Sequence, residues 1–436
     1  AAAAGGVVHV GPRVVPQLTG ALPALADDAF SCVTYNVLLP NSQDGWWIYK
    51  YYRDPDSTTT SWNHRQALLR TYFDRTAADL LCLQECSALS FEGDFAFLRE
   101  AGYESVLMAK GRMRCASFWR SDRWEAVASA EKDRTLVTAL RRRGGPKAGA
   151  TIFLVNGHLA AGPSADRRLR QAEEALAAAA KEAKRLGLDP ARTPVVFAGD
   201  FNAMGSTAVR ELLLTGEVGP AFREPECKQT TSKLRKQAFG AFADAGEACA
   251  PDGKAFPTML VPDLESAMLD GGSPSKAFLD KVNLAFDKCL RQEAPGSDAL
   301  SQAGVERYLT TINKELGRGS EFRFAEAAMK ERGSSALVRE DFVELYKSEL
   351  AEGKFWGVEH DMRLLLGSGF CVPSAGPCEL VFDHVFYTGG SLELQAVQDP
   401  LTEEQRRRIY SDPWETLPNQ WHPSDHLPVA ATFRLL

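Results

Sequence analysis

Asp200 and Asn202 follow directly after a short apolar run, and both are residue types that bind metal ions and phosphate. The run Val195–Ala198 is β-branched and aromatic and is bounded by Pro194 and Gly199, which predicts a buried strand. Residues i and i+2 of a strand lie on the same side, so the carboxylate and the amide project together at the rim of a sheet. That pair could hold a water or a metal beside a phosphate. The alternative is a strand exit with an Asx turn.

Four other predicted strands end in, or lie beside, a residue of catalytic type. They are 30–37 with Asn36, 79–85 with Glu85, 151–159 with His158, and 378–387 with Asp383. A buried carboxylate without a partner is costly, so Glu85 is either part of a salt bridge or a metal ligand, whereas His158 alone could be structural. Asp425 and His426 lie directly before the last predicted strand. Oxygen-rich ligands favour Mg²⁺, or Mn²⁺ as a substitute, over zinc.

The elements between these strands predict an α/β fold. A helix over 62–75 with Ser61 as its N-cap, an Ala-rich amphipathic helix over 163–186 and a strand–helix–strand order indicate layered packing. Further elements are expected as follows: helices at 91–101 and 206–214, strands at 103–108, 115–119 and 135–140, and an irregular stretch at 238–258.

Three residues outside these strand ends are candidates for substrate binding. Trp46 lies in a long aromatic loop, 38–61, and could stack on a base or ring; packing under the loop is the alternative. Arg112 and Arg114 form a local basic cluster that could bind phosphate, or could be a solvated edge.

Composition limits the classes of protein and partner. At 436 residues, 44% hydrophobic and 25% charged, the chain is typical of globular protein with two or three units. The net charge of −7 differs from the positive charge typical of proteins that bind the backbone of long nucleic acids. A phosphate substrate would therefore bind to a local basic patch or to metal ions. No window is long and apolar enough for a transmembrane segment. Nine cysteines without a CxxC pair predict free thiols and an intracellular location, in the cytoplasm or an organelle.

Two segments stand apart from the α/β pattern. Residues 1–28 are rich in Ala, Gly and Pro and are expected to be flexible; they could be the remnant of a processed presequence. From 276 to 352 the sequence predicts four short helices: 278–290, 301–316, 321–330 and 338–350.

Two pieces of this helical segment, 300–305 and 337–342, resemble the second half of an EF-hand loop. Placing Leu337 at the eighth loop position puts Lys330 first and Arg332 third, and the other loop has Pro295 third and Gly304 last. Because calcium needs oxygen ligands at such positions, we expect a degenerate EF-hand-like pair that does not bind calcium. Such a module could contact a protein partner.

Taken together, the motifs resemble the signature blocks of the endonuclease/exonuclease/phosphatase superfamily. The blocks are Tyr35-Asn36, Leu83-Gln84-Glu85, Gly157-His158-Leu159, Gly199-Asp200-Phe201-Asn202 and Ser424-Asp425-His426-Leu427-Pro428. Blocks over 35–38, 62–65, 79–85, 168–171 and 383–387 resemble its deadenylase and nocturnin branch, although His384 stands where that branch usually has Tyr. The resemblance implies a four-layered α/β sandwich, two packed mixed β-sheets flanked by helices. The expected catalytic parts are 29–258 and 371–436, separated by an all-α, EF-hand-like insertion at 259–370.

The resemblance also implies a role for each candidate. Glu85 would ligate the principal Mg²⁺ with Asn36 close by, and Asp200 would activate the attacking water. Asn202 and His158 would hold phosphate oxygens, His426 would stabilise the phosphate and be oriented by Asp383, and Asp425 would add a metal contact. Asp200, Asn202 and His426 are also candidate metal contacts, and Asn36, His158 and Asn202 candidate substrate contacts.

The implied activity is Mg²⁺-dependent phosphodiester hydrolysis, with RNA or a nucleotide as substrate. The first hypothesis is a 3′–5′ exoribonuclease of the poly(A) deadenylase type. The alternative keeps the chemistry but acts on a small phosphorylated metabolite, such as an NADP(H)-like dinucleotide, or on a phospholipid headgroup. A non-enzymatic scaffold would be expected to have lost a ligand, yet every expected position is filled.

Overall fold

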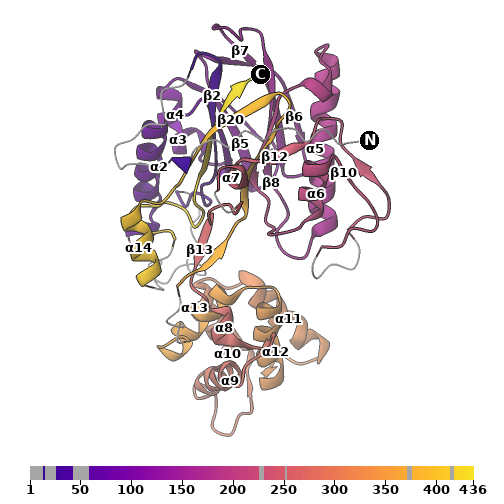
Figure 1. Ribbon diagram of the computed structural model, residues 1–436. Helices are drawn as coiled ribbons and strands as arrows, with labels where there is room; N and C mark the ends of the chain where they lie inside the picture. The colour runs from indigo at the N-terminus through magenta and orange to yellow at the C-terminus, as the bar shows by residue number, and fades with distance from the viewer. Residues whose placement is uncertain are drawn as a thin grey trace.

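The computed structural model describes residues 13–14, 26–42, 58–224, 230–250, 253–370, 376–412 and 417–436. Figure 1 shows a layered α/β body above a separate cluster of helices. Two sheets form the centre of the α/β body. The first sheet has the order β1 (Arg13–Val14), β20 (Leu392–Gln398), β21 (Val429–Leu435), β2 (Ala29–Asn36), β3 (Leu80–Ser87), β5 (Met113–Arg120), β4 (Tyr103–Leu107).

The second sheet packs face to face against the first. Its order is β12 (Phe242–Asp244), β19 (Asp383–Thr388), β9 (Val195–Asp200), β8 (Thr151–His158), β7 (Thr135–Arg142), β6 (Trp124–Lys132). Each sheet is mixed, because β2 pairs with β3 and β8 with β9 in parallel while their other neighbours run antiparallel. Both inner faces are apolar: Cys32 and Leu80 of one sheet share a buried cluster with Leu154 and Val196 of the other.

Helices cover both outer faces, so the predicted four-layered sandwich is confirmed. On the first sheet lie α2 (Trp62–Thr76), α3 (Phe91–Asp94) and α4 (Ala96–Glu100), and on the second lie α5 (Ala165–Arg185) and α6 (Ala208–Thr215). The periodicity of α5 explains its placement, since its small side chains such as Ala172, Ala175 and Ala179 are buried against the sheet. Ser61 is the N-cap of α2, as expected, and accepts a hydrogen bond from the backbone of His64.

The helical body has its own core. Its helices are α8 (Glu265–Met268), α9 (Lys276–Leu290), α10 (Gln302–Asn313), α11 (Gly319–Glu331), α12 (Arg339–Ala351) and α13 (Phe355–Leu366). Two short strands, β16 (Ala299–Leu300) and β17 (Leu337–Val338), pair between the two loops that resemble EF-hand loops. A narrow antiparallel ribbon, β13 (Met259–Val261) with β18 (Cys378–Leu380), leads from the sandwich into this body (Figure 1).

The remaining elements are short. They are η1 (Thr58–Thr60), η2 (Pro190–Arg192), β10 (Glu217–Val218), β11 (Arg235–Lys236), α7 (Ala245–Ala248), β14 (Leu269–Asp270), β15 (Ser273–Pro274) and α14 (Glu403–Ser411). No helix in the described ranges is long and apolar enough to cross a membrane. The seven cysteines that lie in those ranges are free thiols.

Several local expectations differ from the structure. The helix predicted over 91–101 is broken at Phe95 into α3 and α4. The stretch 238–258, expected to be irregular, contains β12, which pairs with β19 at the edge of the second sheet. The sequence pattern does not predict β6 or α13. Both are stabilised by tertiary neighbours: β6 by its hairpin with β7, and α13 by packing on α9 and α10.

The structure describes only part of the N-terminal segment 1–28, which the sequence predicts to be flexible. Most of 1–28 lies outside the described residues, but Arg13–Val14 form β1, which pairs in parallel with β20.

Candidate active site

Strand register aligns three of the candidate side chains at one rim of the second sheet. His158 is the last residue of β8 and lies opposite Asp200, the last residue of β9, because these strands run parallel. Strand β19 runs antiparallel, so its first residue, Asp383, lies opposite Asp200 on the other side. Positions 158, 200 and 383 therefore form one row across the sheet, with Asp200 in the middle.

Two glycines allow the parallel strands to approach closely beside this row. Gly199 has φ +148° and lies opposite Gly157. A Cβ at position 199 would overlap the carbonyl oxygen of Gly157. A residue with a side chain would therefore separate β8 from β9 next to Asp200.

Asn36 connects this row to the first sheet. Its amide nitrogen lies 3.1 Å from Oδ2 of Asp200 and 3.3 Å from Oε1 of Glu85, and therefore donates to both carboxylates. Glu85 has φ +62° at a bulge in the β3–β5 pairing, an uncommon conformation that aims its side chain. Its other oxygen accepts a hydrogen bond from the backbone N–H of Leu39 at 2.9 Å. One amide thus lies between carboxylates from two different sheets.

A histidine–carboxylate pair completes the cluster. Nδ1 of His426 lies 2.7 Å from Oδ2 of Asp383, and its Nε2 lies 3.9 Å from Oδ2 of Asp200. Ser424 positions this loop, since its hydroxyl donates to the carbonyl of Asn36 and accepts from the N–H of His426.

The two histidines have opposite electrostatic environments. Burial lowers the pKa of His158 to about 4, despite Asp200 at 3.6 Å from its Nε2. Burial alone would also lower the pKa of His426, but the charge and hydrogen bond of Asp383, with Asp200 and Asp425 nearby, raise it well above the usual value. Near neutral pH, His158 is therefore neutral and His426 carries a positive charge. Burial raises the pKa of Asp200, which makes this carboxylate a stronger base.

The donor set suits a hard divalent cation that retains water ligands. Within the described ranges, no group of three or more His, Cys, Asp and Glu side chains is arranged as a closed metal cage. Mg²⁺ is usually held by one or two carboxylates together with waters and substrate phosphates. Glu85 and Asp200, on either side of the Asn36 amide, provide such an open oxygen-rich set. One Asp383 oxygen and Nδ1 of His158 are buried without a hydrogen-bond partner.

Arg65 is a positioning residue whose role is not predicted from the sequence. It is completely buried in α2, and its guanidinium donates to the carbonyls of Val37, Leu38 and Leu39 and to that of Pro423. These carbonyls belong to the loops after Asn36 and before Asp425. A charged residue on the apolar face of α2, one turn before Leu69, was the available signal.

The other predicted site residues differ in their placement. Asn202 adjoins the cluster: its N–H donates to Asp200 at 2.8 Å, its amide donates to the carbonyl of Leu159, and its φ is +48°. The guanidinium of Arg114 donates to the carbonyls of Met108 and Gly111 in its own hairpin, so the structure does not bring it to the cluster. Trp46 lies outside the described residues.

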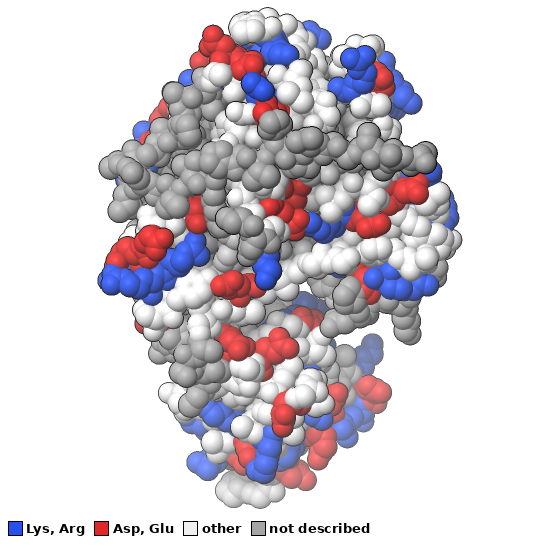
Figure 2. All heavy atoms as spheres, viewed as in Figure 1, with Lys and Arg blue, Asp and Glu red and all other residues white. Residues whose placement is uncertain are grey.

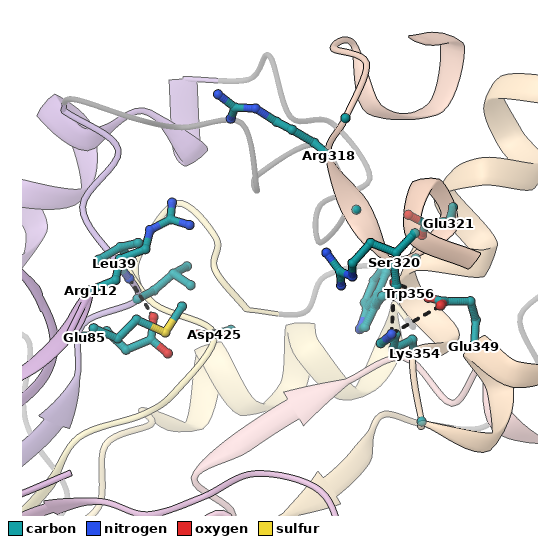
Figure 3. A pocket seen from close by; sticks show the side chains of 17 residues that line it. Leu39, Glu85, Arg112, Arg318, Ser320, Glu321, Glu349, Lys354, Trp356 and Asp425 are labelled. Atoms are coloured by element: carbon teal, nitrogen blue, oxygen red, sulfur yellow. Dashed lines mark hydrogen bonds and ion pairs between the residues drawn. The ribbon is translucent and has the colours of Figure 1, made fainter. Parts of the chain in front are cut away.

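A cavity of about 680 Å³ lies beside the cluster, on the side of Glu85 and Asp425. One wall is formed by the sandwich, with Glu85, Asp425, Arg112 and Leu39, and the opposite wall by the helical body (Figure 3). The helical wall includes the following residues: Arg318, Ser320, Glu321, Arg323, Glu349, Lys354 and Trp356. Of the predicted metal and substrate residues, Glu85, Asp425 and Arg112 line this cavity. Its volume is large enough for a small ligand, since such sites span about 300–1,000 Å³.

Surface charge is mixed on the face seen in Figure 2. Among the described residues, basic and acidic side chains alternate over both the sandwich and the helical body. A continuous basic stripe, as expected for gripping a long nucleic-acid backbone, is not visible on the described part of this face.

Comparisons with known proteins agree with this geometry. The endonuclease/exonuclease/phosphatase family profile matches residues 33–426. The CCR4-Not complex 3′-5′-exoribonuclease subunit Ccr4 of Saccharomyces cerevisiae is 25% identical over 236 residues, covering 44% of this chain and 28% of that protein. The chain thus spans less than a third of the length of this curated relative.

Two solved structures are similar to this chain at low identity. ANGEL2, a 2′,3′-cyclic phosphatase solved with adenosine-2′,3′-vanadate, has a TM-score of 0.52 and 16% identity, covering 93% of this chain and 96% of that one. The human nocturnin catalytic domain has a TM-score of 0.48 and 14% identity, covering 94% and 95%. On the extent of the family match and the convergence of its motif residues, the chain belongs to the endonuclease/exonuclease/phosphatase family, whose members hydrolyse phosphate esters.

Proposed function

We propose that the protein is a Mg²⁺-dependent 3′–5′ exoribonuclease of the deadenylase type, which removes nucleotides from the 3′ end of adenylate-rich RNA. The observation that carries the chemistry is the cluster in which Asn36 links Glu85 to Asp200 beside the His426–Asp383 pair. The similarity to an exoribonuclease subunit supports the choice of RNA.

Hydrolysis of a phosphodiester accumulates negative charge on the non-bridging oxygens. His426 carries a positive charge, and Asp383 fixes its ring through Nδ1, so Nε2 is the nitrogen available to stabilise that charge. Neutral His158 contributes a second polar contact on the other side of Asp200. The hydrogen bond to Asp383 holds the His426 ring in place before substrate binds, which reduces the reorganisation needed in the transition state.

Asp200 is the proposed base for the attacking water. It lies in the middle of the catalytic row, and burial raises the pKa of its carboxyl group, which favours accepting a proton. Asn36 and the N–H of Asn202 orient the two Asp200 oxygens, at 3.1 and 2.8 Å respectively.

Glu85 and Asp200 would hold Mg²⁺, with the amide of Asn36 between them. Asp425 lines the cavity together with Glu85. A bound Mg²⁺ polarises the phosphoryl oxygens and neutralises charge as it develops. Mn²⁺ is the expected substitute because it accepts the same oxygen ligands.

A second candidate activity is hydrolysis of a small phosphorylated metabolite such as an NADP(H)-like dinucleotide. Two observations favour it: the helical body narrows the approach to the cluster, and the visible charge is mixed. A product assay with Mg²⁺ separates the two candidates. It compares oligo(A), mixed-sequence RNA, DNA, 2′-5′ oligoadenylate and NADPH as substrates, each with an EDTA control.

If the protein is an exoribonuclease, it should release AMP stepwise from the 3′ end of oligo(A), and EDTA should abolish this release. Phosphate release from NADPH without AMP release from oligo(A) would contradict it and support the second candidate.

A further inference from the structure

We propose that the helical body is the outer wall of the substrate pocket, where Trp356 stacks on a base and Arg323 contacts a phosphate of the bound nucleotide. This inference rests on the proposed function and adds a recognition site in the helical body. The site is specific for a nucleotide portion, which the 3′ end of RNA and a dinucleotide share.

The helical body is attached to the sandwich beside His426 and Asp383, and this attachment determines its position. Met259, the first residue of β13, forms an isolated bridge with His426. The Thr258 hydroxyl accepts hydrogen bonds from the N–H groups of Phe382 and Asp383, at 3.0 and 3.1 Å. The β13–β18 ribbon that leads into the helical body therefore begins beside His426 and Asp383, and it holds the helical body next to them.

The side chain of Trp356 lines the cavity, where its ring could stack on a base. It lies in the first turn of α13 and is half-buried, packing partly on the core of the helical body while also lining the cavity. Figure 3 shows it on the helical wall, across the cavity from Glu85 and Arg112. An aromatic ring that lines a cavity can stack on a base, because every base presents a flat face.

Basic residues flank the ring. Arg323 is exposed on α11 and lines the cavity. Lys354 also lines it and is held in place by Ser320 and Glu349, at 3.0 and 3.2 Å. On the opposite wall, Arg112 is exposed next to the catalytic cluster. Lys354 is paired with Glu349 and Glu352. A nucleotide between the two walls would therefore have Arg323 and Arg112 for its phosphates and Trp356 for its base.

The test compares two substrates across matched variants. Trp356→Ala and Arg323→Ala remove the proposed contacts. Phe355→Ala and Lys330→Ala are the controls: Phe355 adjoins Trp356 and packs on the same core without lining the cavity, and Lys330 is exposed on the same helix as Arg323. The substrates are oligo(A) and bis(4-nitrophenyl) phosphate, a minimal diester that has no base and no second phosphate.

If Trp356 stacks on a base, Trp356→Ala should lower kcat/KM for oligo(A) about tenfold, mainly by raising KM. A tenfold loss is the effect expected when one stacking contact is removed. Arg323→Ala should lower it in the same direction. Hydrolysis of the minimal diester should change less than about twofold in either variant, and both controls should resemble the wild type. An unchanged kcat/KM for oligo(A), or an equal loss on both substrates, would overturn the inference.

The outcomes also separate this inference from the proposed activity. Wild-type enzyme that cleaves NADPH but not oligo(A) would overturn the exoribonuclease proposal, and the same variants would then test the wall with NADPH. Wild-type enzyme that cleaves only the minimal diester would overturn both.

Discussion

Replacing Arg65 by Met tests whether one buried guanidinium holds the loops that present the metal-binding residues. The variant keeps most of the apolar side chain but removes the donors to the carbonyls of Val37, Leu38, Leu39 and Pro423. Each buried carbonyl that loses its partner costs about 1–3 kcal/mol, partly offset because a buried charge no longer has to be desolvated. We expect the free energy of unfolding to fall by about 4 kcal/mol.

The same substitution should lower kcat because Leu39 holds Glu85 through its N–H, 2.9 Å from the carboxylate. The control is Arg70→Met on the same helix, an exposed residue whose nearest carboxylate, that of Asp74, is 3.7 Å away. Such an exposed pair contributes less than about 1 kcal/mol. Urea unfolding and steady-state kinetics on both variants provide the measurement. Equal stability and activity of the two variants would refute the clamping role of Arg65.

Two further predictions concern other parts of the fold. Oδ2 of Asp244 lies 2.7 Å from Nδ1 of His384, which is partly buried. Burial alone would lower the pKa of His384, but the charge and hydrogen bond of Asp244 outweigh it and raise this pKa above 6.5, while Arg210 opposes the shift. The pair therefore stabilises the fold fully below pH 6.5 and less as pH rises through the folded pKa, so Asp244→Asn should cost more stability at pH 6 than at pH 9 in urea unfolding; a pH-independent cost would contradict this. Calcium should leave the thermal unfolding of the full chain unchanged, because Arg332, at a third loop position, pairs bidentately with Asp341, at the twelfth; a clear calcium-dependent rise in Tm would contradict the degenerate-loop interpretation.

The sequence predicted those parts of the site that follow from local pattern. Asn36, His158 and Asp200 end apolar strands, and the structure places each at the last position of its strand. Their convergence could be inferred because strand ends meet at one rim, and because the motif order resembles a known family.

Other features depend on contacts between residues far apart in the chain. Arg65 donates to Pro423, 358 positions away, and His384 pairs with Asp244, 140 positions away. Neither partner can be chosen from local periodicity. The cavity wall formed by Trp356 and Arg323 required the placement of the helical body, which no strand or helix pattern specifies.

The proposed activity depends on a divalent cation held by Glu85, Asn36 and Asp200. Equilibrium Mn²⁺ binding to the full chain, measured by electron paramagnetic resonance, tests this metal site without relying on turnover. We expect Glu85→Gln to weaken Mn²⁺ binding at least about tenfold, while Glu100→Gln, an exposed control, leaves it unchanged. Equal Mn²⁺ affinity of the wild type and Glu85→Gln would show that Glu85 is not a metal ligand.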